Sequence, residues 1–366
     1  MTASDTHPSD ILRQGIHDRA FPGATAEVGR ANGPIWRRAI GTFTYERDSP
    51  AVRHDTIFDL ASLTKVIATT TLTMRAVDDG LLALDEPVAK HIPEWRGNDR
   101  QTVTIRDLLS HASGLPAYLP FFRDHTGRVE FAPAIAHTPL EYPPRSQSLY
   151  SDLGFMLLGF VLEDVRRAAD IPRGRFDPSA TLTAQFRRVA SFVTIEPLAY
   201  NPPRTWRARS APTERDEWRG RTLQGEVHDE NAWALGGAAG HAGLFGTAGA
   251  VGAFAQSVLR TIGGERVIAG PATFREFIRR TEIPGSSRAL GWDTMLPTSS
   301  CGSRMSPTAI GHTGFTGTSL WIDWERDLYV VLLTNRVYPT RENNRLRAIR
   351  AAFHDAVMDD LAGERY

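Results

Sequence analysis

Ser62 and Lys65 are the residues whose types and spacing most directly suggest chemistry. Of the 42 basic residues in the chain, only Lys65 and Lys90 are lysine. A serine hydroxyl is a weak nucleophile until a neighbouring base removes its proton. A lysine amine can be that base, whereas arginine keeps its proton in proteins. A serine followed three residues later by a rare lysine therefore predicts nucleophilic catalysis by Ser62.

A helix that begins near Ser62 would bring the two side chains together. The residues from Ser62 to the Asp-Asp-Gly at 78–80 predict such a helix, with Gly80 as its terminator. Side chains three apart at the start of a helix share a face. Burial, or the partial positive charge of the helix N-terminus, would lower the pKa of Lys65 and favour its action as a base.

Two further stretches extend this pattern. "SLYSDLGFMLLG" places Tyr150 just before a helix, and "IGHTGFTGTSLWID" places His312-Thr313-Gly314 just before a strand. Together with "SLTK", they resemble the three ordered motifs of the penicillin-recognising serine hydrolases, most closely the branch of class C β-lactamases and DD-peptidases. "TVTIRDLLSHASGLP" and "GLFGTA" are similar to stretches typical of that branch, so the resemblance covers about residues 20–340.

The resemblance implies a role for each residue of the first two motifs. Ser62 would be the acylated nucleophile, and Lys65 would be the base that shares its proton. Tyr150 would join this proton relay and would help to activate the deacylating water or to protonate the leaving group. Taken alone, Tyr150 is equally well explained as a half-buried aromatic residue, so its place among the three motifs is what favours catalysis.

The third motif would form the edge that binds the substrate. The resemblance implies that His312 places a polar side chain, neutral or positive, beside the substrate, although a polar residue at a sheet edge would look the same. Thr313 and Gly314 would continue this edge, and Gly314 would let it approach the substrate backbone closely. The backbone N–H groups of Ser62 and Phe315 would form the oxyanion hole. The family chemistry needs no cofactor and no metal.

Asp152 departs from the family pattern. The third position of the tyrosine motif is asparagine in β-lactamases and many DD-peptidases, where its amide can donate to a substrate carbonyl. An ionised aspartate only accepts hydrogen bonds, so Asp152 would favour a cationic or N–H-bearing group and could pair with Lys65 and raise its pKa. Asp152 could equally be the N-cap of the following helix. Either role makes efficient β-lactamase activity less expected.

The loop "GEVHDENAWALGGAAGHAG" carries several residues that can bind metals or substrates. They are His228, Asp229, Glu230, Asn231 and His241. Their spacing matches no zinc motif, so we expect the loop to hydrogen-bond its own backbone and to wall the cleft, with Asn231 or Glu230 contacting the substrate. The preceding "APTERDEWRGR" could supply an arginine for a substrate carboxylate.

The pattern of elements predicts an α/β (α+β) fold of the β-lactamase/transpeptidase type. β-Hairpins are expected within 24–45 and 318–335, a helix from 152 with one apolar stripe, and a closing helix at 346–361. Residues 133–146 and 170–231 read as irregular segments, the second of which could cover the site. We therefore expect a central antiparallel sheet from both termini, flanked by helices, with an inserted and mostly helical lobe. The domain would be a single one over 1–366, with a sheet lobe at about 1–60 and 286–366 and a helical lobe at about 61–285.

Composition narrows the possible partners and compartments. The chain of 366 residues is 41% apolar and 23% charged, which is ordinary for a soluble globular protein. Its formal net charge of zero gives no reason to expect a nucleic-acid or membrane partner, and the single cysteine excludes an internal disulfide. The polar N-terminus and the lack of an apolar run of about 20 residues indicate a cytoplasmic protein.

The sequence therefore predicts a serine hydrolase that works through an acyl-Ser62 intermediate. The expected substrate is a peptide or amide of D-amino-acid type, or a small ester. A true β-lactamase is the alternative within enzymes. A catalytically silent binding protein is the alternative outside them, although Ser62, Lys65 and Tyr150 are all present.

Overall fold

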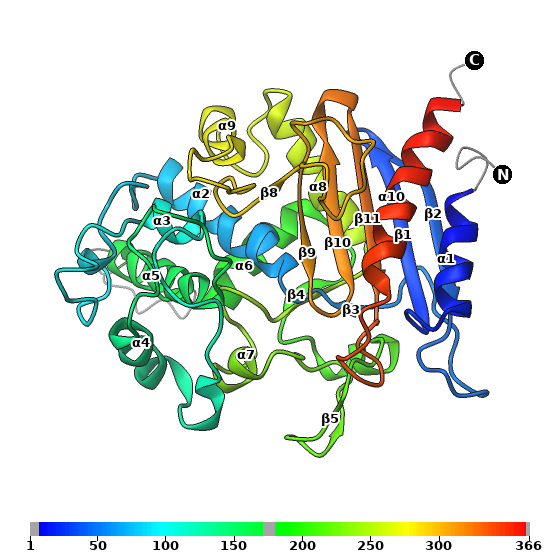
Figure 1. Ribbon diagram of the computed structural model, residues 1–366, viewed down its shortest axis with the longest axis horizontal. Helices are drawn as coiled ribbons and strands as arrows, with labels where there is room; N and C mark the ends of the chain where they lie inside the picture. The colour runs from blue at the N-terminus through cyan, green and yellow to red at the C-terminus, as the bar shows by residue number, and fades with distance from the viewer. Residues whose placement is uncertain (1–6, 171–179, 364–366) are drawn as a thin grey trace.

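The computed structural model describes residues 7–170 and 180–363, and its central feature is a six-stranded antiparallel sheet (Figure 1). The strand order is β2-β1-β11-β10-β9-β8, so strands from both ends of the chain lie side by side. Their bounds are β1 (Gly23–Arg30), β2 (Gly33–Gly41), β8 (Asp293–Thr294), β9 (Ile310–Gly314), β10 (Thr318–Asp323) and β11 (Leu328–Thr334). The predicted sheet from the two termini is confirmed.

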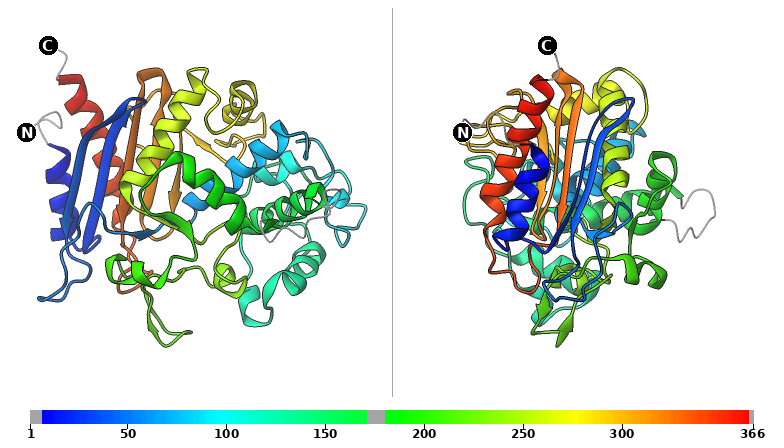
Figure 2. Two further views of the ribbon diagram at one scale, coloured as in Figure 1. Left: turned by 180° about the vertical axis from the view of Figure 1, so that it is seen from behind. Right: turned by 90° about the vertical axis from the view of Figure 1, so that its right-hand side faces the viewer.

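Helices cover both faces of this sheet because its central strands are apolar on both sides. Alternate residues of β11, such as Val330 and Leu332, pack under α1 (Pro8–His17) and α10 (Leu346–Gly363). The residues between them, such as Val331, face α8 (Ala248–Ile262) on the other side. Figure 2 shows α1 and α10 on one face and α8 on the opposite face. All seven residues of β11 are buried, as the apolar run in the sequence predicts.

The remaining elements form a mostly helical region inserted between β2 and β8. Its helices are η1 (Lys65–Thr70), α2 (Thr71–Asp78), η2 (Val88–Lys90), α3 (Ile105–Leu109), η3 (Phe121–Arg123), α4 (Gly127–His137), α5 (Asp152–Asp170), α6 (Leu182–Val193), η6 (Arg204–Arg209), α7 (Glu230–Ala234) and α9 (Pro271–Ile278). Its short strands are β3 (Phe58–Asp59), β4 (Leu198–Tyr200), β5 (Arg215–Asp216), β6 (Arg221–Thr222) and β7 (Leu244–Gly246). A further short helix, η7 (Trp324–Arg326), joins β10 to β11. The inserted, mostly helical lobe is therefore confirmed, although α8 packs against the sheet.

Two segments that the sequence predicts to be irregular contain helices. Pro133 lies inside α4, where a proline costs about 3 kcal/mol. Burial of Phe131 and Ile135 offsets that cost, since each fully buried side chain contributes about 1.5–3 kcal/mol. In the segment 170–231, α6 buries Leu182 and Phe186 on one face. Residues 171–179 of this segment lie outside the described residues.

In the described ranges, no helix combines the length and the apolar character that crossing a membrane requires.

Truncating Leu332 should test how much the sheet core contributes to stability. Leu332 is fully buried between the sheet and the helices α1 and α10. Leu332→Ala should lower the free energy of unfolding by about 2–5 kcal/mol, because the lost contacts leave a cavity. The matched control is Ile35→Ala on β2, where the side chain is 50% exposed and the expected change is within about 0.5 kcal/mol. Urea unfolding would measure both, and equal effects would contradict this description of the core.

Candidate active site

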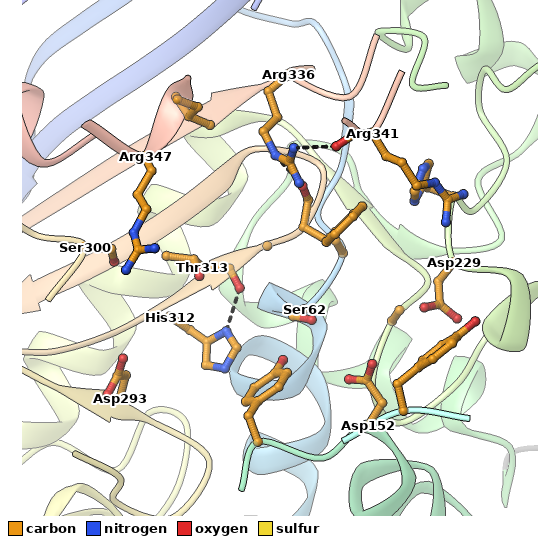
Figure 3. A pocket seen from close by; sticks show the side chains of 18 of the residues that line it. Ser62, Asp152, Asp229, Asp293, Ser300, His312, Thr313, Arg336, Arg341 and Arg347 are labelled. Carbon is orange, nitrogen blue, oxygen red and sulfur yellow. Dashed lines mark hydrogen bonds between the residues drawn. The ribbon is translucent and has the colours of Figure 1, made fainter. Parts of the chain in front are cut away.

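The predicted nucleophile, Ser62, lines a cavity within the described part of the chain. This cavity has a volume of about 680 Å³, and Figure 3 shows Arg347 and Asp293 on one side of Ser62 and Asp152, Asp229 and Arg341 on the other. Of the predicted site residues, the ones that line it are Ser62, Tyr150, Asp152, His312, Thr313, Gly314 and Phe315. Lys65 is fully buried directly behind Ser62. The three motifs, which lie up to 250 residues apart in the chain, therefore meet in one place.

Ser62 and Lys65 have the geometry of a nucleophile and its base. Ser62 lies in the turn that leads into η1, and the Lys65 Nζ donates a hydrogen bond to the Ser62 Oγ at 3.0 Å. The segment η1 is a π-helix, a form that often marks functional sites. The predicted helix from near Ser62 to Asp78 is thus present. Its first part, η1, is wound as a π-helix and its second part, α2, is an α-helix.

The turn that presents Ser62 is held by polar groups which the sequence reasoning missed. The carboxylate of Asp59 accepts hydrogen bonds from the N–H groups of Ala61 at 2.8 Å and of His228 at 2.7 Å. Ala61 has a φ of 45°, an unfavourable backbone conformation for a residue with a Cβ atom. Asp59 therefore stabilises a strained turn directly before the nucleophile. Its signal in the sequence is an acidic residue inside the apolar run "IFDLA".

Hydroxyl groups of the third motif join this turn to the sheet. Thr316 Oγ1 donates to the Asp59 carbonyl at 2.7 Å, and Thr318 Oγ1 donates to the Leu60 carbonyl at 3.0 Å. Gly314 is needed here for close packing, since a Cβ atom at this position would lie 2.5 Å from the Leu60 carbonyl oxygen. The close approach predicted for Gly314 is therefore made to the turn at residues 59–62, called here the nucleophile turn because it presents the candidate nucleophile Ser62.

The Lys65 ammonium is held in its charged form. Its Nζ lies 2.7 Å from Asp152 Oδ1 and donates to the His241 carbonyl at 3.0 Å. Burial pushes the pKa of Lys65 down, but the negative charge of Asp152, with a further contribution from Tyr150, outweighs burial and raises the pKa above its ordinary value. The expectation that burial or the helix N-terminus lowers this pKa is therefore wrong, because the carboxylate is closer.

Asp152 is not the cap of helix α5. That role belongs to Ser151, whose Oγ accepts a hydrogen bond from the Gly154 N–H at 3.4 Å. The carboxylate of Asp152 instead faces the cavity and Lys65 (Figure 3). Of the two roles that the sequence leaves open, the structure supports the pairing with Lys65.

Tyr150 stands at the centre of a cluster of rings and cations. The Lys65 Nζ lies 4.9 Å from the centroid of its ring and the guanidinium of Arg288 lies 5.1 Å from it. The rings of His111 and His312 lie at 4.6 and 5.7 Å. Burial raises the pKa of Tyr150, although Lys65 opposes this shift. Tyr150 is thus a neutral phenol at ordinary pH, and Arg288 is a neighbour that the sequence did not reveal.

His312 is a neutral imidazole. Its Nδ1 lies 2.8 Å from the Thr313 carbonyl, to which it can only donate, so Nε2 carries the lone pair. Within the described ranges Nε2 is buried without a hydrogen-bond partner. Burial, together with the positive charges of Arg288 and Lys65, holds the pKa of His312 well below its usual value. Of the two charge states that the sequence allows, the structure favours the neutral one.

The loop that follows β6 forms one wall of the cavity, as expected, and of the two residues expected to contact a substrate Glu230 lines the cavity and Asn231 does not. Asp229 and Glu230 line the cavity together with His228. Asn231 is fully buried, and both ends of its amide bind backbone, as Nδ2 donates to the Leu119 carbonyl and Oδ1 accepts from the Phe122 N–H. Asn231 therefore fixes α7 against η3. Glu230 lines the cavity, and its carboxylate pairs with Arg341 at 2.7 Å.

The arginines of "APTERDEWRGR" do not reach the cavity. Arg215 pairs with Glu46, Arg219 with Asp216, and Arg221 with Glu226. The arginines that line the cavity come from later in the chain, namely Arg288, Arg336, Arg341, Arg347 and Arg350. Sequence reasoning could not select them, because arginine is common throughout this chain.

Metal-ligating residues do not converge on one point. His241 pairs with Asp229 and His228 with Glu214, both at 2.9 Å. Within the described ranges, no group of three or more His, Cys, Asp or Glu side chains is arranged to hold a metal ion.

Comparison with known proteins agrees with this geometry. The profile of the family described as Beta-lactamase matches residues 9–354. The chain belongs to the Beta-lactamase family. Homologues in this family are serine hydrolases, and the resemblance drawn from the three motifs is confirmed at this level.

Relatives within the Beta-lactamase family carry several activities in their names. A Salmonella gallinarum protein provisionally named a D-alanyl-D-alanine carboxypeptidase is 29% identical over 401 residues, which cover 98% of this chain and 90% of that protein. The structure of EstCE1, a hydrolase with promiscuous acyltransferase activity, has a TM-score of 0.73 and 22% identity, covering 97% and 98% of the two chains. A class C β-lactamase from Rhodobacter sphaeroides has a TM-score of 0.73 and 19% identity, covering 97% and 99%. The two structures show the shared fold.

Removing the charge of Asp152 should shift the pH dependence of Ser62 reactivity. In Asp152→Asn the pKa of Lys65 should fall, since the carboxylate that holds its proton is gone. The rate at which a fluorophosphonate labels Ser62 should then rise at a pH about one to three units lower than in the wild type. Asp152→Glu keeps the charge and is the control. If the labelling rates of Asp152→Asn and the wild type rise with the same midpoint pH, Asp152 does not control the pKa of Lys65.

Proposed function

We propose that this chain is a serine hydrolase that acts through a covalent acyl-Ser62 intermediate. The observation that carries the proposal is the Lys65 Nζ at 3.0 Å from the Ser62 Oγ, at the floor of a cavity large enough for a small peptide or ester. Tyr150 adds a second proton-transfer group against the same lysine. A nucleophile in contact with a base, which other groups orient in turn, is the arrangement that covalent catalysis requires.

In the proposed reaction, the Ser62 Oγ attacks the substrate carbonyl and its proton moves to the unprotonated form of Lys65. The N–H groups of Ser62 and Phe315 would stabilise the oxyanion, since both residues line the cavity. The tetrahedral intermediate then collapses, and the leaving group receives a proton through Tyr150. A water molecule attacks the acyl-enzyme, releases the acid and restores the Ser62 hydroxyl.

The leading substrate class is a peptide or amide of D-amino-acid type, or a small ester. The provisional name of the Salmonella gallinarum relative supports the first, and the hydrolase EstCE1 supports the second. The acidic wall of the cavity supports acyl groups that carry N–H or ammonium groups, because Asp152 and Asp229 accept hydrogen bonds and repel carbonyl oxygens.

Substrate binding would also help to generate the base. Lys65 is charged in the unliganded protein because Asp152 raises its pKa. A substrate N–H or ammonium group bound to Asp152 would share that negative charge and lower the pKa of Lys65. Binding of a suitable substrate and activation of Ser62 would thus be coupled through one carboxylate.

Two other functions remain as alternatives. A β-lactamase is supported by the fold of the Rhodobacter sphaeroides enzyme, but Asp152 stands where β-lactamases use an asparagine to donate to the acylamide carbonyl. A silent binding protein would keep the scaffold without turnover, and the contact between Ser62 and Lys65 argues against it.

Covalent labelling would test the proposal. The intact mass of the wild type and of Ser62→Ala should be measured after incubation with a fluorophosphonate and, in a separate sample, with a penicillin. We expect one fluorophosphonate adduct on the wild type and none on Ser62→Ala. Lys65→Met should lower the labelling rate by at least about a hundredfold, because a general base contributes about 10²–10⁴.

Turnover assays would separate the alternatives. D-Alanine release from an acetylated peptide that ends in D-Ala-D-Ala would support the peptidase, and p-nitrophenyl acetate hydrolysis without peptide cleavage would support the esterase. Rapid hydrolysis of penicillin would favour the β-lactamase. If no reagent modifies Ser62, the acyl-enzyme proposal is wrong and the silent binding protein becomes the better description.

A further inference from the structure

The end of the cavity next to Tyr150 carries more positive charge than the protein itself neutralises. Arg288, Arg347 and Arg350 line the cavity, and Arg336, which also lines it, is close enough to Arg350 to lower its pKa. Asp293 lines the cavity as well and lies 4.0 Å from Arg288. Positive charges therefore outnumber negative charges among these side chains.

Arg350 is the most informative of the three. Its side chain lines the cavity but the residue is only 8% exposed. Throughout the described residues, its guanidinium has no ion-pair partner, and its buried Nε has no hydrogen-bond acceptor. Burial, with a contribution from Arg336, lowers the pKa of Arg350 to about 10, so the group stays charged at neutral pH. A buried charge without a partner is costly, and an anion bound in the cavity would compensate for it.

Arg347 and Arg288 approach this end of the cavity from two different elements. Arg347 lies one turn before Arg350 on α10, and its side chain likewise has no ion pair with any described residue. Arg288 lies over the Tyr150 ring and near Asp293. Figure 3 shows Arg347 above Asp293 on the left of the view, with Thr313 and His312 nearer Ser62. Arg288 and the two arginines of α10 thus come from separate parts of the chain, an arrangement that suits two separate carboxylates better than one phosphate.

We propose that the leaving portion of the substrate carries two carboxylates, as a dicarboxylic amino acid such as glutamate does. One carboxylate would pair with Arg350 and Arg347, and the other with Arg288 beside Tyr150. This end would receive the leaving portion because Tyr150, which protonates the leaving group, lies directly under Arg288. The assignment rests on the proposed function, since it takes Ser62 as the nucleophile and Tyr150 as the proton donor.

Binding to a protein that cannot react would test the proposal without depending on turnover. The ligands are N-acetyl-D-Ala-D-Glu and N-acetyl-D-Ala-D-Gln, which have nearly the same shape and differ by one carboxylate. Isothermal titration of Ser62→Ala should give a Kd at least about tenfold lower for the glutamate peptide, because its second carboxylate can accept charge-assisted hydrogen bonds from the arginines and the amide of the glutamine peptide cannot. Equal Kd values would overturn the proposal, as would no binding of either peptide.

Two double variants would assign the effect to the arginines. Ser62→Ala/Arg350→Met and Ser62→Ala/Arg347→Gln should each reduce the preference for glutamate to about threefold or less. Arg347 is exposed, so the second variant remains informative if the first does not fold. Ser62→Ala/Arg47→Met removes one positive charge from an exposed turn and should keep the full preference. An unchanged preference in both arginine variants would overturn the assignment.

The outcomes separate this inference from the proposed function. Fluorophosphonate labelling of wild-type Ser62 tests the nucleophile without any carboxylate in the reagent. If the reagent labels Ser62 but the two peptides bind with equal Kd values, the proposed hydrolase function stands and the dicarboxylate substrate is rejected. Preferential binding of the glutamate peptide without labelling would keep the anion subsite and reject the acyl-enzyme.

Discussion

The arrangement of the site depends on one buried ammonium group. Lys65 is inaccessible to solvent, and its Nζ contacts the Ser62 hydroxyl, the Asp152 carboxylate and the His241 carbonyl. An ammonium group has three protons to donate, and a charge this deeply buried must use all of them. The three acceptors belong to three separate segments of the chain. Lys65 therefore joins the nucleophile turn, the start of α5 and the glycine-rich loop before β7 at a single point.

The nucleophile turn is also fixed from the side of the sheet. Thr316 and Thr318 donate to the carbonyls of Asp59 and Leu60, and the Asp59 side chain holds the strained Ala61. Ser62 thus lies at the junction of the sheet and the inserted helices, and its position depends on both. A substitution in the sheet or in the inserted helices could therefore change the distance between the Ser62 hydroxyl and the Lys65 amine, even where the substituted residue does not contact Ser62.

The same junction separates the charges of the cavity. Asp152, Asp229 and Glu230 come from the helical side, and Arg347 and Arg350 come from α10 on the sheet side. The protein as a whole has a formal net charge of zero, so this division is a property of the fold. A substrate that lies across Ser62 would meet Asp152 and Asp229, with Glu230 paired to Arg341, on one side and the α10 arginines, with Asp293, on the other. Orientation of the scissile bond would follow from this polarity.

Much of this architecture can be predicted from the sequence because it rests on local rules. The alternation along β11 and the apolar stripe of α5 determine which faces are buried, and the spacing of Ser62 and Lys65 determines their contact on a helical turn. The helix α6 was missed although its buried residues recur at helical spacing, because the prolines and arginines around it suggested an irregular segment. The helix α4 was missed for a related reason, since a proline argued against it and tertiary burial outweighed that cost.

The sequence by itself determined the family and the order of the motifs, and it selected Ser62 and Lys65 as the candidate nucleophile and base, since these follow from residue types at short spacings. Only the tertiary structure decided the charge states of Lys65 and His312, the role of Asp152 and the choice of arginines in the cavity. The physical reason is that a pKa or an ion pair depends on groups that approach within a few ångströms. In this protein those groups come from separate segments of the chain, as Lys65 and Asp152 do.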